Sequence, residues 1–293
     1  MNRYYSVNNG ISATTIKLIA LATMLIDHLT VYIYAPMMIR LKAGLLFDVS
    51  NDLIYMLGRG IGRLSYPLFC FLIAQGAKYS ASRLKYAFRI GIFAIISTPC
   101  YNLAKYNRLL NGEELNIMFG LMIGLVTIML IDYVRELDRR NLFKIILGLI
   151  IIIAMSAIAI ILHIEYSACS VLLISAFYYA ERLPIYERVI PDLASRRVNL
   201  GSIALVLGLY IYYFFWTLGN SGEAITFSSA SHNAIMLFGK DICVLAAFIP
   251  IWYFNDGQGK KLPRYFSYVI YPLHLAVLGI VECIIKGILI FNP

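Results

Sequence analysis

Ionisable side chains interrupt the first long apolar stretch of the chain, residues 15–35, which contains Lys17, Asp27 and His28. Lys17 and His28 are eleven positions apart. At about 100° per residue this spacing brings them onto one face of a helix, about 16 Å apart along its axis. A charge inside a membrane helix costs about 2.5 to 3.5 kcal/mol and usually has a functional role. A cation at the end of this face and an imidazole deep in the helix suit a substrate with an anionic head and a reactive tail, such as acyl-coenzyme A.

The same spacing is also compatible with a structural interpretation. Lys17 could extend to the inner membrane interface, and His28 could be satisfied by contacts between helices. Asp27 points about 100° away from His28, so a direct pair between them is not expected. The candidates for its partner are Arg63 and Arg59 in the next apolar stretch, and our hypothesis is a buried pair between Asp27 and Arg63.

Further polar side chains lie in or near the other apolar stretches. His274 is on the last of them, and we expect it either to support the reacting residue from behind or to serve as an alternative base. Asn102, Asn116, Glu165 and Tyr166 lie near the predicted outer ends of three stretches, where they either face solvent or bind substrate. The five cysteines show no C-x-x-C spacing, so we expect no metal.

The elements that must hold these residues are membrane helices. Of the 293 residues, 60% are hydrophobic and only 14% are charged, whereas a soluble domain carries about 25% charged residues. A helix needs about 20 apolar residues to cross a bilayer. The sequence therefore predicts an all-α, polytopic transmembrane bundle that forms one domain over residues 1–293. We expect about nine spans, at residues 15–35, 60–77, 86–104, 115–134, 143–162, 166–180, 199–217, 233–254 and 266–290.

The net charge of +9 predicts membrane orientation rather than nucleic-acid binding. Most of the 25 Lys and Arg residues lie in the connections after the second, fourth, sixth and eighth predicted spans. Cytoplasmic connections carry this excess, so we predict a multi-pass membrane protein with a cytoplasmic amino terminus. Arg40, Lys42, Arg59 and Arg63 then lie on the outer side, against the rule, and need partners.

Several short motifs resemble those of the TraX family of integral membrane acetyltransferases. They occur in the expected order along nearly the whole chain: Leu25-Ile26-Asp27-His28, Gly62-Arg63-Leu64-Ser65-Tyr66-Pro67-Leu68-Phe69, Ser97-Thr98-Pro99-Cys100-Tyr101-Asn102, Leu115-Asn116-Ile117-Met118-Phe119-Gly120, Glu165-Tyr166 and Tyr271-Pro272-Leu273-His274. Tyr101 and Glu165 stand where the family pattern has Phe and Asp.

The resemblance implies an enzyme of a bacterial cell membrane that takes an acetyl group from cytosolic acetyl-coenzyme A. In related membrane acyltransferases, an early span contains a basic or polar residue that is separated by ten positions from a catalytic His. Lys17 and His28 match this spacing. His28 would then be the base or nucleophile, with Asp27 and Arg63 beside it and Lys17 on the donor. The acceptor would be an extracytoplasmic amine or hydroxyl, on a pilin-like polypeptide or a surface glycan. The resemblance is also compatible with a homo-oligomer.

Two other functions remain compatible with the residues alone. Intramembrane charges also line the paths of transporters of small-molecule or lipid-linked substrates. A non-catalytic assembly partner in the membrane is the third alternative.

Overall fold

The computed structural model describes residues 10–42, 52–138, 140–220, 226–260, 262–263 and 265–287. Over these residues the chain is helical, and the strand-like pairing is limited to two isolated bridges, Ile11 with Phe254 and Leu115 with Ile164. The predicted all-α class is therefore confirmed. The helices are α1 (Ala13–Leu29), α2 (Ala35–Leu41), α3 (Leu53–Gly62), α4 (Ser65–Tyr79), α5 (Arg83–Tyr106), α6 (Ile117–Glu136), α7 (Asn141–Ile161), α8 (Ser167–Tyr179), α9 (Pro184–Val189), α10 (Leu193–Asn220), α11 (Phe227–Lys240), α12 (Phe248–Trp252) and α13 (Phe266–Lys286).

Two shorter helical segments link these helices. A π-helical turn, η1 (Thr30–Tyr34), joins α1 directly to α2, and a 3₁₀ segment, η3 (Ile242–Ala247), lies between α11 and α12. The π turn begins two residues after His28. Such turns are rare and are frequent at functional sites.

Six of the described helical segments are long and apolar enough to cross a membrane, and a seventh is counted if the pair broken by 55° between α11 and α12 forms one span. The protein is thus a multi-pass membrane protein. The predicted count of nine is not confirmed. α4 has 15 residues and α8 has 13, so each is only about 20 Å long against a hydrocarbon core of about 30 Å. The orientation in the membrane stays a prediction.

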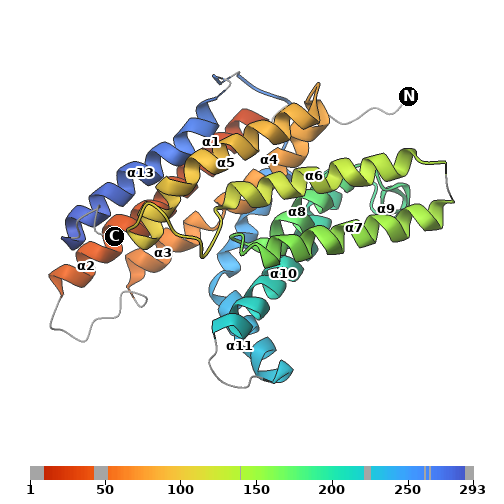
Figure 1. Ribbon diagram of the computed structural model, residues 1–293. Coiled ribbons are helices and arrows are strands. Elements are labelled where there is room, and N and C mark those ends of the chain that lie inside the picture. The colour runs from red at the N-terminus through yellow and green to blue at the C-terminus, as the bar shows by residue number, and fades with distance from the viewer. Residues whose placement is uncertain are drawn as a thin grey trace.

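The helices form two adjoining groups (Figure 1). α1, α4, α5 and α13 pack side by side, and α6, α7, α8 and α10 form the second group. Contacts of α4 with α8 and of α5 with α6 join the groups. α7 lies at the edge, and only Gly148 and Ala159 of its residues are buried. The apolar remainder of α7 is suited to contact with lipid.

Glycines allow the closest helix approaches. A Cβ atom on Gly62 would lie 2.2 Å from Asp27 Cβ, and one on Gly58 would lie 2.1 Å from Thr30 Oγ1. α3 therefore lies directly against the end of α1 and the π turn. Gly120 and Gly124 do the same for α6 against Ser170 and Ile174 of α8. Small residues are used in this way where membrane helices pack.

Pro67 explains the break between α3 and α4. Proline has no N–H, so it cannot donate to the carbonyl of Arg63 four residues earlier. The helix is interrupted at Arg63 and Leu64, and α4 restarts with Pro67 in its first turn. The interruption leaves Arg63 at a helix end, beside α1.

Candidate functional site

A cavity of about 440 Å³ lies between α1, α4, α5, α6 and α13. This volume is within the usual range for small-molecule sites. Its wall includes Lys17, Asp27, His28, Arg63, Glu165 and Tyr166, six of the nine residues that the sequence singles out. The predicted common face of Lys17 and His28 is thus a wall of one cavity.

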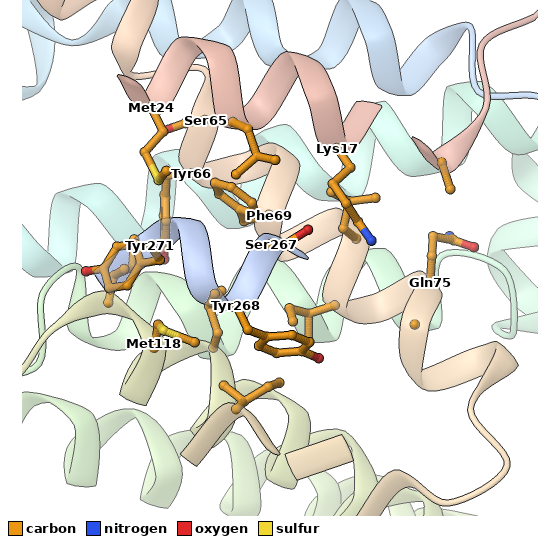
Figure 2. Close-up of a pocket in the computed structure, with 18 of the residues that line it drawn as sticks. Lys17, Met24, Ser65, Tyr66, Phe69, Gln75, Met118, Ser267, Tyr268 and Tyr271 are labelled. Carbon is orange, nitrogen blue, oxygen red and sulfur yellow. The ribbon is translucent and has the colours of Figure 1, made fainter. Parts of the chain in front are cut away.

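The Lys17 end of the cavity is cationic. The Lys17 side chain extends from α1 into the space beside Ser267, Tyr268 and Gln75 (Figure 2), and it forms no ion pair with any described residue. Arg89 of α5 also lines the cavity, and its Nε atom is buried without a hydrogen-bond partner in the described structure. Two cations that have no anionic partner among the described residues favour a negatively charged ligand here.

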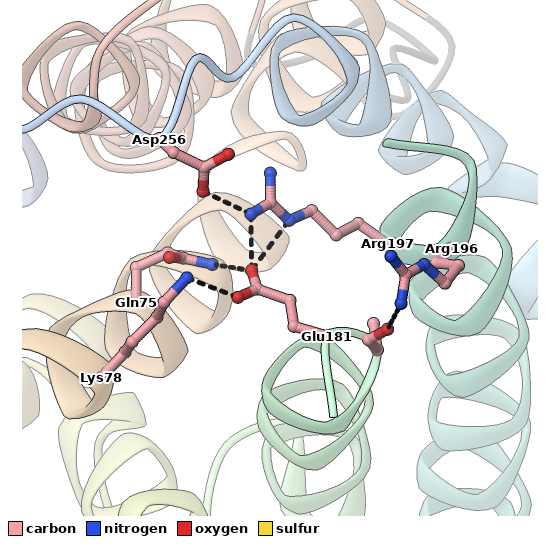
Figure 3. A network of polar contacts seen from close by, with 7 residues as sticks. Gln75, Lys78, Glu181, Arg196, Arg197 and Asp256 are labelled. Atoms are coloured by element: carbon pink, nitrogen blue, oxygen red, sulfur yellow. Dashed lines mark hydrogen bonds and ion pairs between the residues drawn. The ribbon is translucent and has the colours of Figure 1, made fainter. Parts of the chain in front are cut away.

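A network of ionic contacts holds the chain around this end (Figure 3). The buried Arg197 of α10 donates from Nε to Glu181 (3.0 Å) and from Nη2 to Asp256 (2.6 Å). Lys78 and Gln75 of α4 also donate to Glu181, at 2.5 and 3.1 Å. Burial alone would raise the pKa of the Glu181 carboxyl, but the charge of Arg197 and these hydrogen bonds lower it to about 2.

The loop that follows Asp256 closes over the start of α1. The amide of Ala13 donates to Gly257 O (2.8 Å), and the hydroxyl of Thr14 donates to Gln258 O (2.8 Å). Thr14 and Gln258 both line the cavity. The Arg197 network therefore fixes the loop that shapes the cationic end.

The two histidines meet at the other end. His28 Nδ1 lies 2.6 Å from Nε2 of His274, and His274 Nδ1 lies 2.7 Å from the carbonyl oxygen of Ile270 on its own helix. The two rings are nearly parallel, with centroids 4.8 Å apart. His274 is buried behind His28, whereas His28 itself is part of the cavity wall.

The predicted pair between Asp27 and Arg63 is wrong. Asp27 pairs with Arg59, the other candidate, at 2.6 Å. Arg63 instead donates from Nε to Asp241 (2.8 Å), and its guanidinium also contacts the hydroxyl of Tyr166. α3 packs against α1 so that Arg59, one turn before Arg63, reaches Asp27. The helix is interrupted at Arg63, and the Arg63 side chain contacts Asp241 at the end of α11 instead.

These contacts account for three of the four cations that the predicted orientation places on the outer side. Arg59 and Arg63 are each neutralised by a carboxylate, and Arg40 of α2 donates to the carbonyl oxygen of Ile285 on α13. Because these cations have partners within the protein, their position on the outer side is compatible with the predicted orientation.

Glu165 reaches the cavity from a strained loop. His163, Tyr166 and Ser167 have positive φ values of 48°, 58° and 34°, a conformation that costs energy and is concentrated at functional sites. The amide of Leu115 donates to His163 O, and the amide of Glu165 donates to Leu115 O, so the loop is fastened to the segment before α6.

Among the described residues, the Glu165 carboxylate has neither an ion pair nor a hydrogen bond, although it lines the cavity. Burial raises the pKa of this carboxyl to about 7, against the opposing charge of Lys105. Such a group changes its protonation state near neutral pH.

The two predicted asparagines do not line the cavity. Asn116 begins α6, where its Oδ1 accepts from the amide of Met118, and its Nδ2 donates to Ala94 O of α5. Asn102 donates to the carbonyl oxygens of Leu109 and Asn111 in the loop after α5. The sequence offers both as substrate-binding residues, but their side-chain nitrogens donate to backbone around α5 and α6, and Oδ1 of Asn102 is buried without a hydrogen-bond partner among the described residues.

Three tyrosines, Tyr32, Tyr66 and Tyr271, are the main site residues that the sequence does not single out, because tyrosines of membrane proteins are generally expected at the membrane interfaces. Tyr32 lies with its ring 5.6 Å from His28, and Tyr271 with its ring 5.7 Å from His274. Tyr66 stacks on Tyr166 at 4.3 Å. All four line the cavity. Tyr66 and Tyr271 lie inside the motifs quoted above, and these motifs could have indicated both tyrosines as site residues.

Comparison with known proteins agrees with the motif pattern. The family described as TraX protein matches residues 12–282. The chain is also 24% identical over 284 residues, 93% of this chain and 96% of the relative, to the "Probable fimbrial assembly protein FimC, serogroup H1" of Dichelobacter nodosus. No solved structure matches. A match that covers almost all of the helical bundle and every residue of the cavity shows that this chain belongs to the TraX family.

Proposed function

We propose that this protein is a membrane-embedded acetyltransferase that moves an acetyl group from acetyl-coenzyme A to a primary amine. The observation that carries the proposal is the composition of one cavity wall: it contains Lys17 and Glu165, neither of which has an ionic partner among the described residues, together with His28. Membership of the TraX family supports the same chemistry.

Lys17 and Arg89 bind the phosphates of the donor. Both line the cavity, and neither has an anionic partner among the described residues. The distance of about 16 Å along α1 from Lys17 to His28 suits a long arm between the phosphates and the thioester. With the predicted orientation, the donor enters from the cytosol.

His28 carries out the proton transfers. As general base it takes a proton from the acceptor nitrogen while that nitrogen attacks the thioester carbonyl carbon. Collapse of the tetrahedral intermediate breaks the C–S bond, and the departing thiolate receives the proton from His28. In the alternative course His28 first accepts the acetyl group itself and passes it to the acceptor. Arg63, which lines the cavity, stabilises the developing oxyanion in either course.

Glu165 favours an amine over a hydroxyl as acceptor. Of the carboxylates in the cavity wall, Asp27 is neutralised by Arg59, whereas Glu165 has no partner among the described residues. An unpaired carboxylate attracts an ammonium group and can take its first proton. That leaves the neutral amine for His28.

A pilin-like polypeptide with a free amino terminus is the acceptor that we favour. The name of the fimbrial assembly relative associates that protein with fimbriae, and the amine preference agrees with a polypeptide terminus. A surface glycan, which offers hydroxyl groups, is the other candidate class.

The test measures coenzyme A release from radiolabelled acetyl-coenzyme A by the purified protein in detergent. A peptide with a free amino terminus is the acceptor, and its amino-terminally blocked counterpart is the control. We expect release and peptide labelling with the free peptide only, and loss of both in His28→Ala. His232→Ala, a change at an exposed histidine of α11, is the matched control. Full activity of a folded His28→Ala protein would overturn the proposal, and mass spectrometry for acetyl-histidine separates the two courses.

A further inference from the structure

His28 and His274 form a chain of two hydrogen bonds that ends on a backbone carbonyl. The chain runs from His28 Nδ1 to His274 Nε2 (2.6 Å), and from His274 Nδ1 to Ile270 O (2.7 Å). The planes of the rings differ by 11°, so they share nearly the same orientation.

The carbonyl at the end sets the direction of both bonds. A carbonyl oxygen only accepts, so His274 Nδ1 must carry a hydrogen. A neutral imidazole carries one ring hydrogen, which leaves His274 Nε2 as an acceptor. His28 Nδ1 must then be the donor. The Nε2 atom of neutral His28 is consequently unprotonated.

We infer that His274 is a positioning residue that fixes His28 in the tautomer with hydrogen on Nδ1, so that Nε2 is the reacting atom. Its role in catalysis rests on the proposed function, whereas the tautomer itself does not. With the opposite tautomer His28 would present an N–H group at Nε2, which can neither remove a proton nor accept an acetyl group.

The placement of His274 agrees with positioning rather than direct participation. It is 9% exposed, and it is absent from the cavity wall that the described residues form, whereas His28 is part of that wall. Its ring is held by its own helix, because Ile270 lies one helical turn before it. His274 therefore reaches the substrate only through His28.

The arrangement also serves the charged state. When His28 Nε2 takes the proton of the acceptor, Nδ1–H continues to donate to His274 Nε2, now from an imidazolium ion. Hydrogen bonds from charged donors are about twice as strong as those between neutral groups. The proton leaves Nε2 with the thiolate of coenzyme A, and His274 keeps its own hydrogen throughout.

The tautomer can be measured without any enzymatic activity. The chain has four histidines, so the ¹⁵N NMR spectrum of histidine-labelled protein in detergent contains few signals, and His28→Ala assigns those of His28. His163 and His232 are exposed and serve as internal references. We expect His28 to show a protonated Nδ1 and a bare Nε2 above pH 7. A hydrogen on Nε2 in the wild-type protein would overturn the inference.

Two substitutions of His274 then connect the tautomer to catalysis. His274→Leu removes the acceptor and should give mixed His28 tautomers, a loss of about 100-fold or more in kcat, and a KM for acetyl-coenzyme A within about threefold of wild type. His274→Gln can offer an amide oxygen to Nδ1. Across the wild type and both variants, kcat must follow the fraction of His28 with a bare Nε2.

The outcomes separate the two proposals. A wild-type kcat in His274→Leu, or a kcat that does not follow the tautomer fraction, overturns the positioning role. If the wild-type protein shows the expected tautomer but consumes no acetyl-coenzyme A with any amine acceptor, the proposed function fails while the assigned tautomer stands.

Discussion

Asp27 and Arg59 pair across the contact between α1 and α3, with 2.6 Å between Oδ1 and Nη1. Gly62 makes this contact possible, because any side chain there would occupy the space of Asp27. The pair holds the residue next to His28 in place, and so the geometry of the site depends on how closely two helices approach.

The pair should appear as a coupling energy in a double-mutant cycle. We expect Asp27→Asn and Arg59→Gln each to destabilise the protein, with a coupling of about 1 to 3 kcal/mol because each leaves the other charge partly buried and unpaired. Unfolding by SDS in mixed micelles measures the free energy of unfolding of each variant, from which the coupling energy is calculated. The cycle of Asp27 with Arg40, which contacts α13 instead, is the control. Additive effects of Asp27→Asn and Arg59→Gln would contradict the assigned pair.

Lys17 should act on the donor and not on the chemical step. Lys17→Ala removes one cation from the cavity end, and loss of one charge-assisted contact of about 1.4 kcal/mol raises the KM for acetyl-coenzyme A about tenfold. The acetyl thioester of pantetheine, which lacks the phosphates, should be used equally well by both proteins. Lys17→Arg should keep most of the affinity. An equal effect on both donors would show that Lys17 does not contact the phosphates.

Glu165 should give the reaction a dependence on pH. Its carboxyl has a pKa of about 7, and only the ionised form attracts an ammonium group. For an amine acceptor kcat/KM should therefore rise as the pH increases through about 7, and Glu165→Gln should lose this rise together with about 100-fold of the rate.

Glu165→Asp, which retains a carboxylate, is the matched variant and should retain a rise with pH. A hydroxyl acceptor supplies the second control, because it carries no charge for Glu165 to attract. If Glu165→Gln has the wild-type profile with the amine, the carboxylate does not bind the acceptor.

The network around Glu181 should contribute stability that is lost in acid. The pKa of Glu181 falls from 4.5 to about 2 in the folded protein. A lowered folded pKa stabilises the protein fully above the unfolded value, and this contribution disappears as the pH falls from about 4.5 to 2. The shift corresponds to about 3 kcal/mol. SDS unfolding at pH 7 and at pH 3 in wild type and Glu181→Gln measures it.

The variant should be less stable than wild type at pH 7 and should lose less stability on acidification. Exposed Glu136, at the end of α6, provides the matched control as Glu136→Gln. A wild-type slope with pH in Glu181→Gln would assign the acid sensitivity to other carboxyls.

The amino-acid sequence by itself determined the class of the fold and one face of the site. Apolar runs of about 20 residues satisfy their backbone hydrogen bonds in a membrane by forming helices. Helical periodicity places Lys17 and His28 on one face because it depends only on local geometry. Gly58 and Gly62, and likewise Gly120 and Gly124, are four residues apart, a spacing that puts small residues on one face of a helix.

Only the tertiary structure decided which side chains meet. His28 and His274 are 246 positions apart, and no local rule predicts their contact. Whether Asp27 meets Arg59 or Arg63 depends on the packing of α3 and on the break before Pro67. The sequence could not show that Asn116 caps α6 rather than binds substrate, because the same residue at the start of an apolar stretch is compatible with both roles. The strained loop at Glu165 likewise depends on its bridge to Leu115. Contacts between distant segments are set by the sum of all helix packings, which periodicity and composition do not encode.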